Sequence, residues 1–315
     1  MILTLTLNPS MDYLYYKDTF KLGLHNKFDN PVKMPGGKGI NCARAIACLN
    51  NDVVALTVLG GSNGQLILND LKKEKFKLEY IEIENESRNA ITVMHDNGVQ
   101  TEIVEKGPVI NDDEVEQVIK RMLELIAKNN IDVVCLNGSA NTSSQNLYDH
   151  IIRILRDKFE NKIKIIADFS EDNLRNCVSN QSYFPDFIKP NELEFEQLTG
   201  EKINNKRDII MELDKLETLI PFVLVSYGAQ GGVARIHNHI YDIEVPRIEV
   251  VNPTGSGDST VAAVACAFNQ KKDDREVLKM AMTGGLANAL EKGVGVINDE
   301  TFKHFYEKIK IKKVK

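Results

Sequence analysis

The stretch from Ile248 to Thr260, IEVVNPTGSGDST, decides how the rest of the chain is interpreted. Its apolar run stops at Asn252 and Pro253, two glycines then bracket a serine, and an aspartate opens a run of small residues. A glycine turn followed by a helix-start carboxylate, which the helix dipole favours, explains this pattern. In a second interpretation, the free backbone N–H groups of residues 255–258 cradle a phosphoryl group while the carboxylate takes a proton from an attacking hydroxyl.

Apolar runs elsewhere in the chain alternate with helical patterns, which predicts βαβ crossovers and a mostly parallel sheet. The runs are IDVVCLNGS, IKIIADFS, DFIKPNE, FVLVSYGAQGG and IEVVNPTGSGD. They end in polar or glycine residues, namely Asn137 and Ser139, Asp168, Lys189 and Asn191, Ser226 and Gly228, and Asp258. Ligands of open α/β sheets bind outside the carboxyl ends of the strands, so we expect the chemistry at this edge.

Two stretches, 11–33 and 88–105, do not follow the strand and helix alternation. The first is rich in Tyr and Phe, and the second carries the hairpin signal DNG at 96–98. We expect both to form antiparallel strands outside the main sheet, as a small β lid. The α/β/α domain then consists of residues 1–10, 34–87 and 106–315.

Composition and charge narrow the class of protein. With 315 residues, 43% of them hydrophobic, and a net charge of −6, the chain lacks the basic footprint of a nucleic-acid-binding protein. Five cysteines without a CxxC pair are typical of a reducing compartment, and Cys42 and Cys48 are interpreted as core residues. The N-terminal stretch MILTLTLNPSMD has no basic region, and no apolar run approaches the roughly 20 residues that span a bilayer. We expect a cytoplasmic protein without a membrane or nucleic-acid partner.

A second glycine-rich motif, PGGKGINCARAIACL, leads into a helix. It is not a P-loop, because Gly39 follows Lys38 where the phosphate-binding pattern needs Ser or Thr. A structural turn explains the glycines. Alternatively, they admit a small ligand close to the backbone, to which Lys38 and Asn41 donate hydrogen bonds.

Other candidate residues have a structural and a functional interpretation. In KPNELE, Asn191 followed by Glu194 matches a capping box, whereas as a ligand site these oxygens would meet Mg²⁺ through its waters. The HNH at 237–239 is interpreted as a hairpin tip, since no third metal ligand is evident nearby. Unless it binds a ligand, Arg88 is interpreted as a solvated side chain. Asp12 is likewise interpreted as a charge at the edge of a strand unless it binds a ligand.

The order and spacing of these motifs resemble the ribokinase-like sugar kinases, the phosphofructokinase B group, over essentially the whole chain. The matching motifs are NPSMD, GGKGIN, SRNA, KPNELE, SYGAQGG and NPTGSGD. Within the group, TLNPSMD, TEIVEKGP and NPTGSGDST are similar to the branch that phosphorylates tagatose 6-phosphate or fructose 1-phosphate. NPTGSGDST favours the tagatose 6-phosphate enzymes.

The resemblance implies a three-layer α/β/α fold with a β lid that also serves as a homodimer contact. It implies transfer of the γ-phosphoryl group of ATP, with Mg²⁺, to a primary hydroxyl of a ketohexose phosphate. The resemblance makes Asp258 the catalytic base and makes Gly255, Ser256 and Gly257 the anion hole. It implies that the substrate is bound by Asp12, Gly37, Lys38, Asn41, Arg88 and Ser139, with Arg88 and Lys38 on its phosphate. It implies an ATP site at Lys189, Ser226, Gly228, Gly231 and Asn288, and a magnesium site at Asn191 and Glu194.

The chain departs from the family pattern at two loops. GSAN at 138–141 replaces the usual GSLP, and DFSE at 168–171 replaces the frequent DxSG. The departures leave the identity of the sugar open. Two other functions stay open as well: a ribokinase-like kinase for an unphosphorylated sugar or nucleoside, and a non-catalytic regulator that binds a sugar phosphate.

Overall fold

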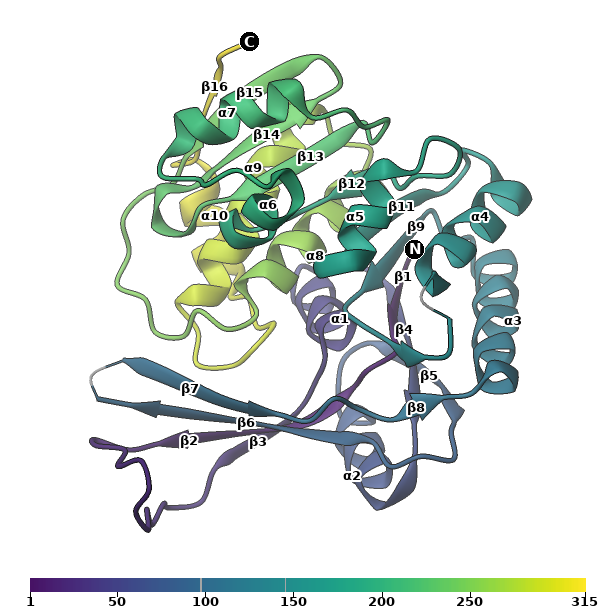
Figure 1. Ribbon diagram of the computed structural model, residues 1–315, viewed down its shortest axis with the longest axis vertical. Helices are drawn as coiled ribbons and strands as arrows, with labels where there is room; N and C mark the ends of the chain where they lie inside the picture. Colours follow the sequence, from purple (N-terminus) through teal and green to yellow (C-terminus); the bar gives the residue numbers. More distant parts are fainter. Residues whose placement is uncertain (97, 145) are drawn as a thin grey trace.

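A computed structural model describes residues 1–96, 98–144 and 146–315, which fold around a ten-stranded sheet (Figure 1). In spatial order its strands are β16 (Lys310–Lys313), β15 (His239–Glu244), β14 (Gly232–Ile236), β13 (Phe222–Ser226), β12 (Phe187–Ile188), β11 (Lys164–Asp168), β9 (Val133–Asn137), β1 (Ile2–Thr6), β4 (Val53–Leu59) and β5 (Lys77–Glu82). From β5 to β13 neighbouring strands run parallel, and β14, β15 and β16 add antiparallel strands at one edge. The predicted mostly parallel sheet is confirmed.

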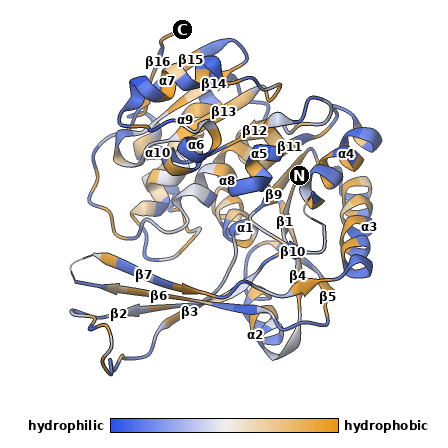
Figure 2. Ribbon diagram, in the orientation of Figure 1, coloured by the Kyte–Doolittle hydropathy of each residue, from blue (hydrophilic) through white to orange (hydrophobic). Residues whose placement is uncertain are grey.

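Helices cover both faces of this sheet, which confirms the three-layer α/β/α architecture. One face packs against α1 (Lys38–Cys48), α2 (Gly61–Leu71), α8 (Ser256–Asn269), α9 (Asp274–Ala289) and α10 (Asp299–Tyr306). The opposite face packs against α3 (Asp112–Asn129), α4 (Leu147–Phe159), α5 (Glu171–Ser179), α6 (Glu192–Thr199) and α7 (Lys206–Lys215). Figure 2 shows mainly hydrophobic central strands beneath helices with one hydrophobic and one hydrophilic side, as burial of one helix face requires.

The run of small residues after Asp258 explains why α8 is so deeply buried. Its side chains from Val261 to Ala267 are fully inaccessible, and α8 packs against both α9 and the sheet. On α9, a Cβ at Gly284 would lie 2.5 Å from the Ser259 carbonyl oxygen, so only glycine permits this approach of the two helices. Close packing therefore holds the first turn of α8 at the carboxyl edge of the sheet.

A separate four-stranded sheet, called the small sheet below, is built from the two stretches that did not fit the alternation. Its order is β3 (Val32–Gly36), β2 (Ser10–Tyr16), β6 (Arg88–His95) and β7 (Val99–Val104). The expectation of purely antiparallel strands is wrong, since β2 pairs with β6 in parallel. Both strands leave the main domain at the same edge and extend in the same direction (Figure 1). The β6–β7 pair confirms the hairpin, although residue 97 of its DNG signal lies outside the described residues.

The expected strand at Ile248–Val251 does not form. After β15 the chain runs as an irregular connection to α8, with about half of Val250 and Val251 exposed. The reason is that β14 turns back antiparallel on β13 and takes the place beside it opposite β12, and β15 and β16 continue the sheet from there. The HNH turn joins these two strands, which confirms the hairpin-tip interpretation.

Shorter elements complete the structure. Strands β8 (Val109–Ile110) and β10 (Asn141–Thr142) form a two-stranded parallel sheet, and Gly228–Gln230 form the 3₁₀ helix η1. Cys42 is buried in the core and Cys48 packs against it, as predicted. Within the described ranges, no helix is both long enough and apolar enough to span a membrane.

Candidate active site

Residues that end the central strands meet at one edge of the sheet, as the sequence predicts. Asn137 ends β9, Asp168 ends β11 and Ser226 ends β13, and these strands are parallel. Asn191 follows β12 and pairs with Ser226 through an isolated β-bridge. The first turns of α1 and α8 lie at the same edge, since Lys38 contacts Asp168 and Asn41 contacts Asp258.

The glycine turn before α8 has the geometry of an anion site. Gly255 is the N-cap residue with φ of 80°, and a Cβ there would lie 2.5 Å from Val294, so both conformation and space require glycine. In the part of the chain that the structure describes, the amides of Gly257 and Asp258 have no hydrogen-bond partner. The Ser256 amide is not free, because it donates to the Pro253 carbonyl at 3.2 Å. The expectation that all amides of residues 255–258 are available is therefore corrected for this position.

Asn288 supports this turn through hydrogen bonds to backbone groups. It is fully buried; its Nδ2 donates to the Thr254 carbonyl at 2.9 Å, and its Oδ1 accepts from the Gly295 amide at 2.8 Å. Its amide thus satisfies backbone groups of the turn. That Asn288 also lines the ATP site stays a prediction.

The Asp258 carboxylate is buried, and both acidic and basic side chains surround it. Asn41 Nδ2 donates to Asp258 Oδ2 at 2.9 Å. Burial and the nearby Asp168 raise the pKa of Asp258 to about 6, against the opposing effects of Lys38, this hydrogen bond and Lys189. A carboxylate with this pKa is ionised at neutral pH and remains a better proton acceptor than an exposed aspartate.

Lys38 and Asp168 form an ion pair beside Asp258. Lys38 Nζ lies 3.4 Å from Asp168 Oδ2. Both Asp168 and Asp258 raise the pKa of the lysine, so its side chain stays protonated and positively charged. Asp168 is almost fully buried. The sequence marked it only as a strand end, because nothing local shows that Lys38 comes to lie against it.

Asp12 and the glycines of the second motif lie at the base of the small sheet. Asp12 accepts a 2.5 Å hydrogen bond from Ser10 Oγ, and burial raises its pKa to about 6. A Cβ on the facing Gly36 would overlap the Asp12 carboxylate. Gly37, with φ of 112°, caps α1 and lies against Thr6, so this loop requires glycine for space and conformation.

Arg88 and Ser139 come together through Asn8, which sequence analysis missed. The Arg88 guanidinium donates to the carbonyl of Asn8 at 3.4 Å and to that of Glu105 at 3.2 Å, and the structure shows no ion pair for it within the described residues. Burial lowers the pKa of Arg88, while Asp12 opposes this shift. Asn8 Nδ2 donates to Ser139 Oγ at 3.3 Å. Long bonds to neutral carbonyls leave the charge of Arg88 available to an anion.

A cavity of about 730 Å³ opens beside the first turn of α8. Its walls include four residues predicted to bind ATP or magnesium, namely Asn191, Ser226, Gly228 and Gly231. Apolar side chains of Val245, Ile248 and Leu286 line the rest, so the segment that was expected to be a strand instead forms a cavity wall. Lys189 Nζ lies against Gly257, 3.3 Å from the position of a Cβ there. The cavity thus joins an apolar compartment to the anion turn.

The capping box in KPNELE is confirmed. Asn191 Oδ1 accepts from the Glu194 amide, and Glu194 Oε2 accepts from the Asn191 amide, both at 2.9 Å. Glu194 also contributes to the raised pKa of Lys38, so its carboxylate lies within electrostatic range of that lysine. Its Oε1 has no bond in the described ranges, which leaves one oxygen of the kind that Mg²⁺ prefers.

Comparison with known proteins identifies the family. Residues 6–301 match the pfkB family of carbohydrate kinases. The chain belongs to this family. It is 37% identical over 318 aligned positions to a tagatose-6-phosphate kinase of Staphylococcus epidermidis, with 99% of each chain covered. The protein is accordingly a phosphotransferase that acts on an alcohol group of a carbohydrate substrate.

Solved structures show the same fold at lower identity. Phosphofructokinase-2 from Escherichia coli in complex with potassium superposes with a TM-score of 0.87 at 23% identity, covering 98% of both chains. Arabidopsis thaliana ribokinase complexed with ribose and ATP superposes with a TM-score of 0.73 at 20% identity, covering 97% of this chain and 98% of the other. The ribokinase-like fold is therefore confirmed.

Both departures from the pfkB pattern line a second, polar cavity of about 520 Å³. GSAN contributes Ser139 to Asn141 and DFSE contributes Ser170 and Glu171. Glu171 has φ of 53°, at the position where the family often has glycine. The loop thus keeps the backbone conformation of a glycine while presenting a carboxylate.

Proposed function

We propose that this pfkB kinase transfers the γ-phosphoryl group of ATP to a primary hydroxyl of a ketohexose phosphate, with tagatose 6-phosphate favoured, and so produces a bisphosphate. The observation that carries the proposal is Asp258. Its buried carboxylate lies in the first turn of α8, directly after the free amide of Gly257 and beside a cavity of nucleotide size. Base and anion site are therefore adjacent, as in-line phosphoryl transfer needs.

Asp258 Oδ1 is the atom that takes the proton. Asn41 occupies Oδ2, which leaves the other oxygen for the substrate hydroxyl. As this oxygen accepts the proton, the substrate oxygen forms its bond to the γ-phosphorus, and the bond from that phosphorus to the leaving oxygen of ADP breaks. The proton stays on Asp258 until it is released with the products.

Charge that develops on the transferred group meets fixed positive groups. The unpaired amides of Gly257 and Asp258 belong to the first turn of α8, so their N–H groups can donate to the phosphoryl oxygens. Lys38 and Lys189 lie within the electrostatic range of Asp258 and add positive charge. Mg²⁺ bound near Asn191 and Glu194 through water would neutralise the phosphate oxygens of ATP. The apolar walls of the cavity, including Val245 and Leu286, would enclose the nucleoside.

Two groups of the small sheet would select the acceptor. Asp12 would accept hydrogen bonds from sugar hydroxyls, and Arg88 would bind the phosphate that the sugar already carries. The relative of 37% identity has this class of substrate in its name. An unphosphorylated sugar would leave the Arg88 guanidinium with only carbonyl partners.

We also propose that the small sheet, which contains the stretches 11–33 and 88–105, closes over the sugar and forms the contact between two copies of the chain. More than half of Tyr16, Ile103 and Val104 is exposed on its strands. Covering these side chains would remove apolar surface from water. Replacing Ile103 by Lys should convert a dimer into a monomer in light-scattering measurements, and a wild-type monomer at working concentration would refute this contact.

A substrate panel tests the reaction. ADP release is measured with tagatose 6-phosphate, fructose 1-phosphate, fructose 6-phosphate and the free sugars, with Asp258→Asn as the control against a contaminating kinase. We expect the highest kcat/KM with tagatose 6-phosphate and little turnover of free sugars. A preference for an unphosphorylated sugar would contradict the proposal.

A further inference from the structure

Arg44 is a buried residue of α1 beside the candidate active site. Its side chain is 7% exposed and makes four hydrogen bonds that use all three nitrogens. Nε donates to Glu74 Oε1 at 2.8 Å, and Nη2 donates to the Pro35 carbonyl at 2.8 Å. Nη1 donates to Asn41 Oδ1 at 3.1 Å and to the Val294 carbonyl at 2.9 Å. A guanidinium in this position connects segments that are far apart in the sequence.

The bond from Arg44 determines which way the Asn41 amide points. A guanidinium can only donate, so the Asn41 atom that faces it has to be the oxygen. The amide nitrogen then faces Asp258, where it donates to Oδ2 at 2.9 Å. If the amide turned over, its oxygen would face the carboxylate and the stabilising hydrogen bond would be lost. Arg44 thus excludes the wrong orientation of the group that holds Asp258.

The remaining partners of Arg44 lie beside the other parts of the site. Pro35 belongs to β3 and pairs with Met11, the neighbour of Asp12. Val294 packs against Gly255 of the anion turn, where a Cβ would lie 2.5 Å from its side chain. One guanidinium therefore contacts the small sheet, the support of the anion turn and the partner of Asp258.

We infer that Arg44 is a positioning residue that keeps Asp258 ready to accept a proton by locking the Asn41 amide and anchoring β3 and the Val294 segment around it. The inference rests on the proposed role of Asp258 as the base. Arg44 itself does not touch the substrate in this scheme. It acts only through Asn41 and the two carbonyls.

Several other titratable groups lie near Asp258 and influence its pKa. Asp168 at the end of β11 raises its pKa, whereas Lys38 of α1 and Lys189 after β12 lower it. The buried Cys42 thiol of α1 is also near, and Asp258 contributes to its raised pKa. None of these groups bonds to Arg44 in the described structure, so a change at Arg44 reaches Asp258 through Asn41.

The test is Arg44→Lys, which keeps the positive charge but cannot reach all four acceptors. Loss of the constraint on Asn41 should move the acid limb of kcat/KM upward by about one pH unit, since the hydrogen bond that favours the ionised form of Asp258 is lost. Well below the limb, this shift means roughly a tenfold lower kcat/KM. The same shift should appear without turnover in a ¹³C NMR titration of aspartate carboxyl carbons, with the Asp258 signal assigned by its absence in Asp258→Asn.

Glu74→Gln is a milder second variant, because it weakens only the contact at Nε. Glu74→Gln should raise the pKa of Asp258 by less than Arg44→Lys does. If Arg44→Lys does not fold, the pKa of Asp258 in Glu74→Gln tests the inference instead. Arg156→Lys is the matched control, because it alters a partly buried arginine whose hydrogen bonds include neither Asn41 nor Asp258, and it should leave the titration in place.

An unchanged Asp258 pKa in the folded Arg44→Lys and Glu74→Gln proteins would overturn the inference, whatever the substrate is. An equal shift in Arg156→Lys would overturn it too, since general loosening would then be the cause. If the pKa shifts as expected but no ketohexose phosphate is turned over, the proposed function fails and the positioning of Asp258 stands.

Discussion

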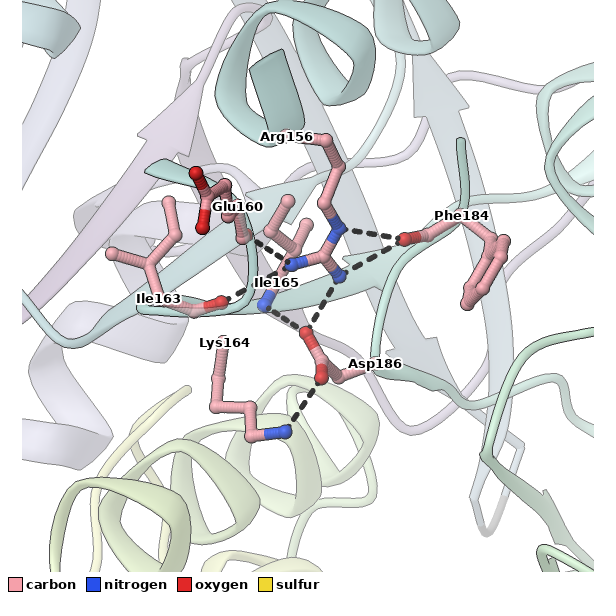
Figure 3. A network of polar contacts seen from close by, with 7 residues as sticks. All are labelled: Arg156, Glu160, Ile163, Lys164, Ile165, Phe184 and Asp186. Atoms are coloured by element: carbon pink, nitrogen blue, oxygen red, sulfur yellow. Dashed lines mark hydrogen bonds and ion pairs between the residues drawn. The ribbon is translucent and has the colours of Figure 1, made fainter. Parts of the chain in front are cut away.

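Two arginines, the buried Arg44 of α1 and the partly buried Arg156 of α4, have similar chemistry in different parts of the domain. Arg156 pairs with Asp186 at 2.7 Å and donates to the carbonyls of Phe184, Ile163 and Glu160 (Figure 3). Like Arg44, it therefore combines one carboxylate with several backbone acceptors.

The partners of the two arginines explain why they differ in function. Asp186 also accepts from the Ile165 amide and from Lys164, so the Arg156 network ties together the beginnings of β11 and β12 (Figure 3). Arg44 instead contacts Asn41, which holds Asp258. In a parallel sheet, ligands bind outside the carboxyl ends of the strands, so the residues at the amino ends contribute only to stability. The same guanidinium geometry thus serves stability at one edge and chemistry at the other.

The largest effect is expected at Asp258. Asp258→Asn keeps the size and most of the packing but removes the proton acceptor, so kcat should fall by about 10²-fold to 10⁴-fold. Steady-state kinetics at saturating ATP and sugar phosphate measures this, and the melting temperature verifies the fold. Turnover at the wild-type rate would show that Asp258 is only a helix-start residue.

Arg156 should show the opposite behaviour. Arg156→Met leaves Asp186 without its arginine partner and should lower the free energy of unfolding by about 3 kcal/mol, at the low end for a broken buried pair because Lys164 still pairs with the carboxylate. Denaturant unfolding gives this value. The kcat of the folded fraction should match wild type, and a selective loss of kcat would refute the division between the two edges.

A more specific loss is expected at Arg88, which distinguishes phosphate binding from sugar binding. Arg88→Ala removes charge-assisted hydrogen bonds worth roughly 1.5 to 3 kcal/mol, so KM for the sugar phosphate should rise about 10-fold to 150-fold. KM for ATP should hardly change, and Arg88→Lys should restore part of the loss because it keeps the charge without the planar fork. Equal KM values in Arg88→Ala and wild type would exclude Arg88 from the phosphate site.

The smallest effect concerns the α6 cap. Asn191→Ala should cost about 1 kcal/mol of stability through loss of the capping box, and it should also raise the magnesium concentration needed for half-maximal rate. Asp273→Ala removes the equivalent cap of α9 and is the matched control, with the same stability loss and an unchanged magnesium titration. If Asn191→Ala behaves like this control, Asn191 acts only as a cap.

Local patterns carried much of the fold and part of the site. The alternation of apolar runs and helices predicted the parallel sheet, and strand ends such as Asp168 then met at one edge because parallel strands share it. The Asn191–Glu194 box was readable because its two bonds span only three residues. Gly255 was readable because few other residues adopt its conformation.

Other features depended on contacts between distant segments. The run at Ile248–Val251 has the composition of a strand, but β12 and β14 already pair with β13, and β15 extends the sheet beyond β14. The direction of β2 against β6 follows from where both strands leave the main domain. Such outcomes depend on competition for partners, which composition alone does not resolve.

The sequence by itself determined the fold class, the helix-start Asp258 and the glycine turn, since these depend on local conformation and on periodicity. Only the tertiary structure decided which groups surround Asp258. Asn41 lies 217 positions away in the chain, and Arg44 reaches Val294 across 250 positions. Burial and neighbouring charge then set the pKa of Asp258, and both are properties of the packed molecule, because the dielectric surroundings of a carboxylate exist only once the segments have come together.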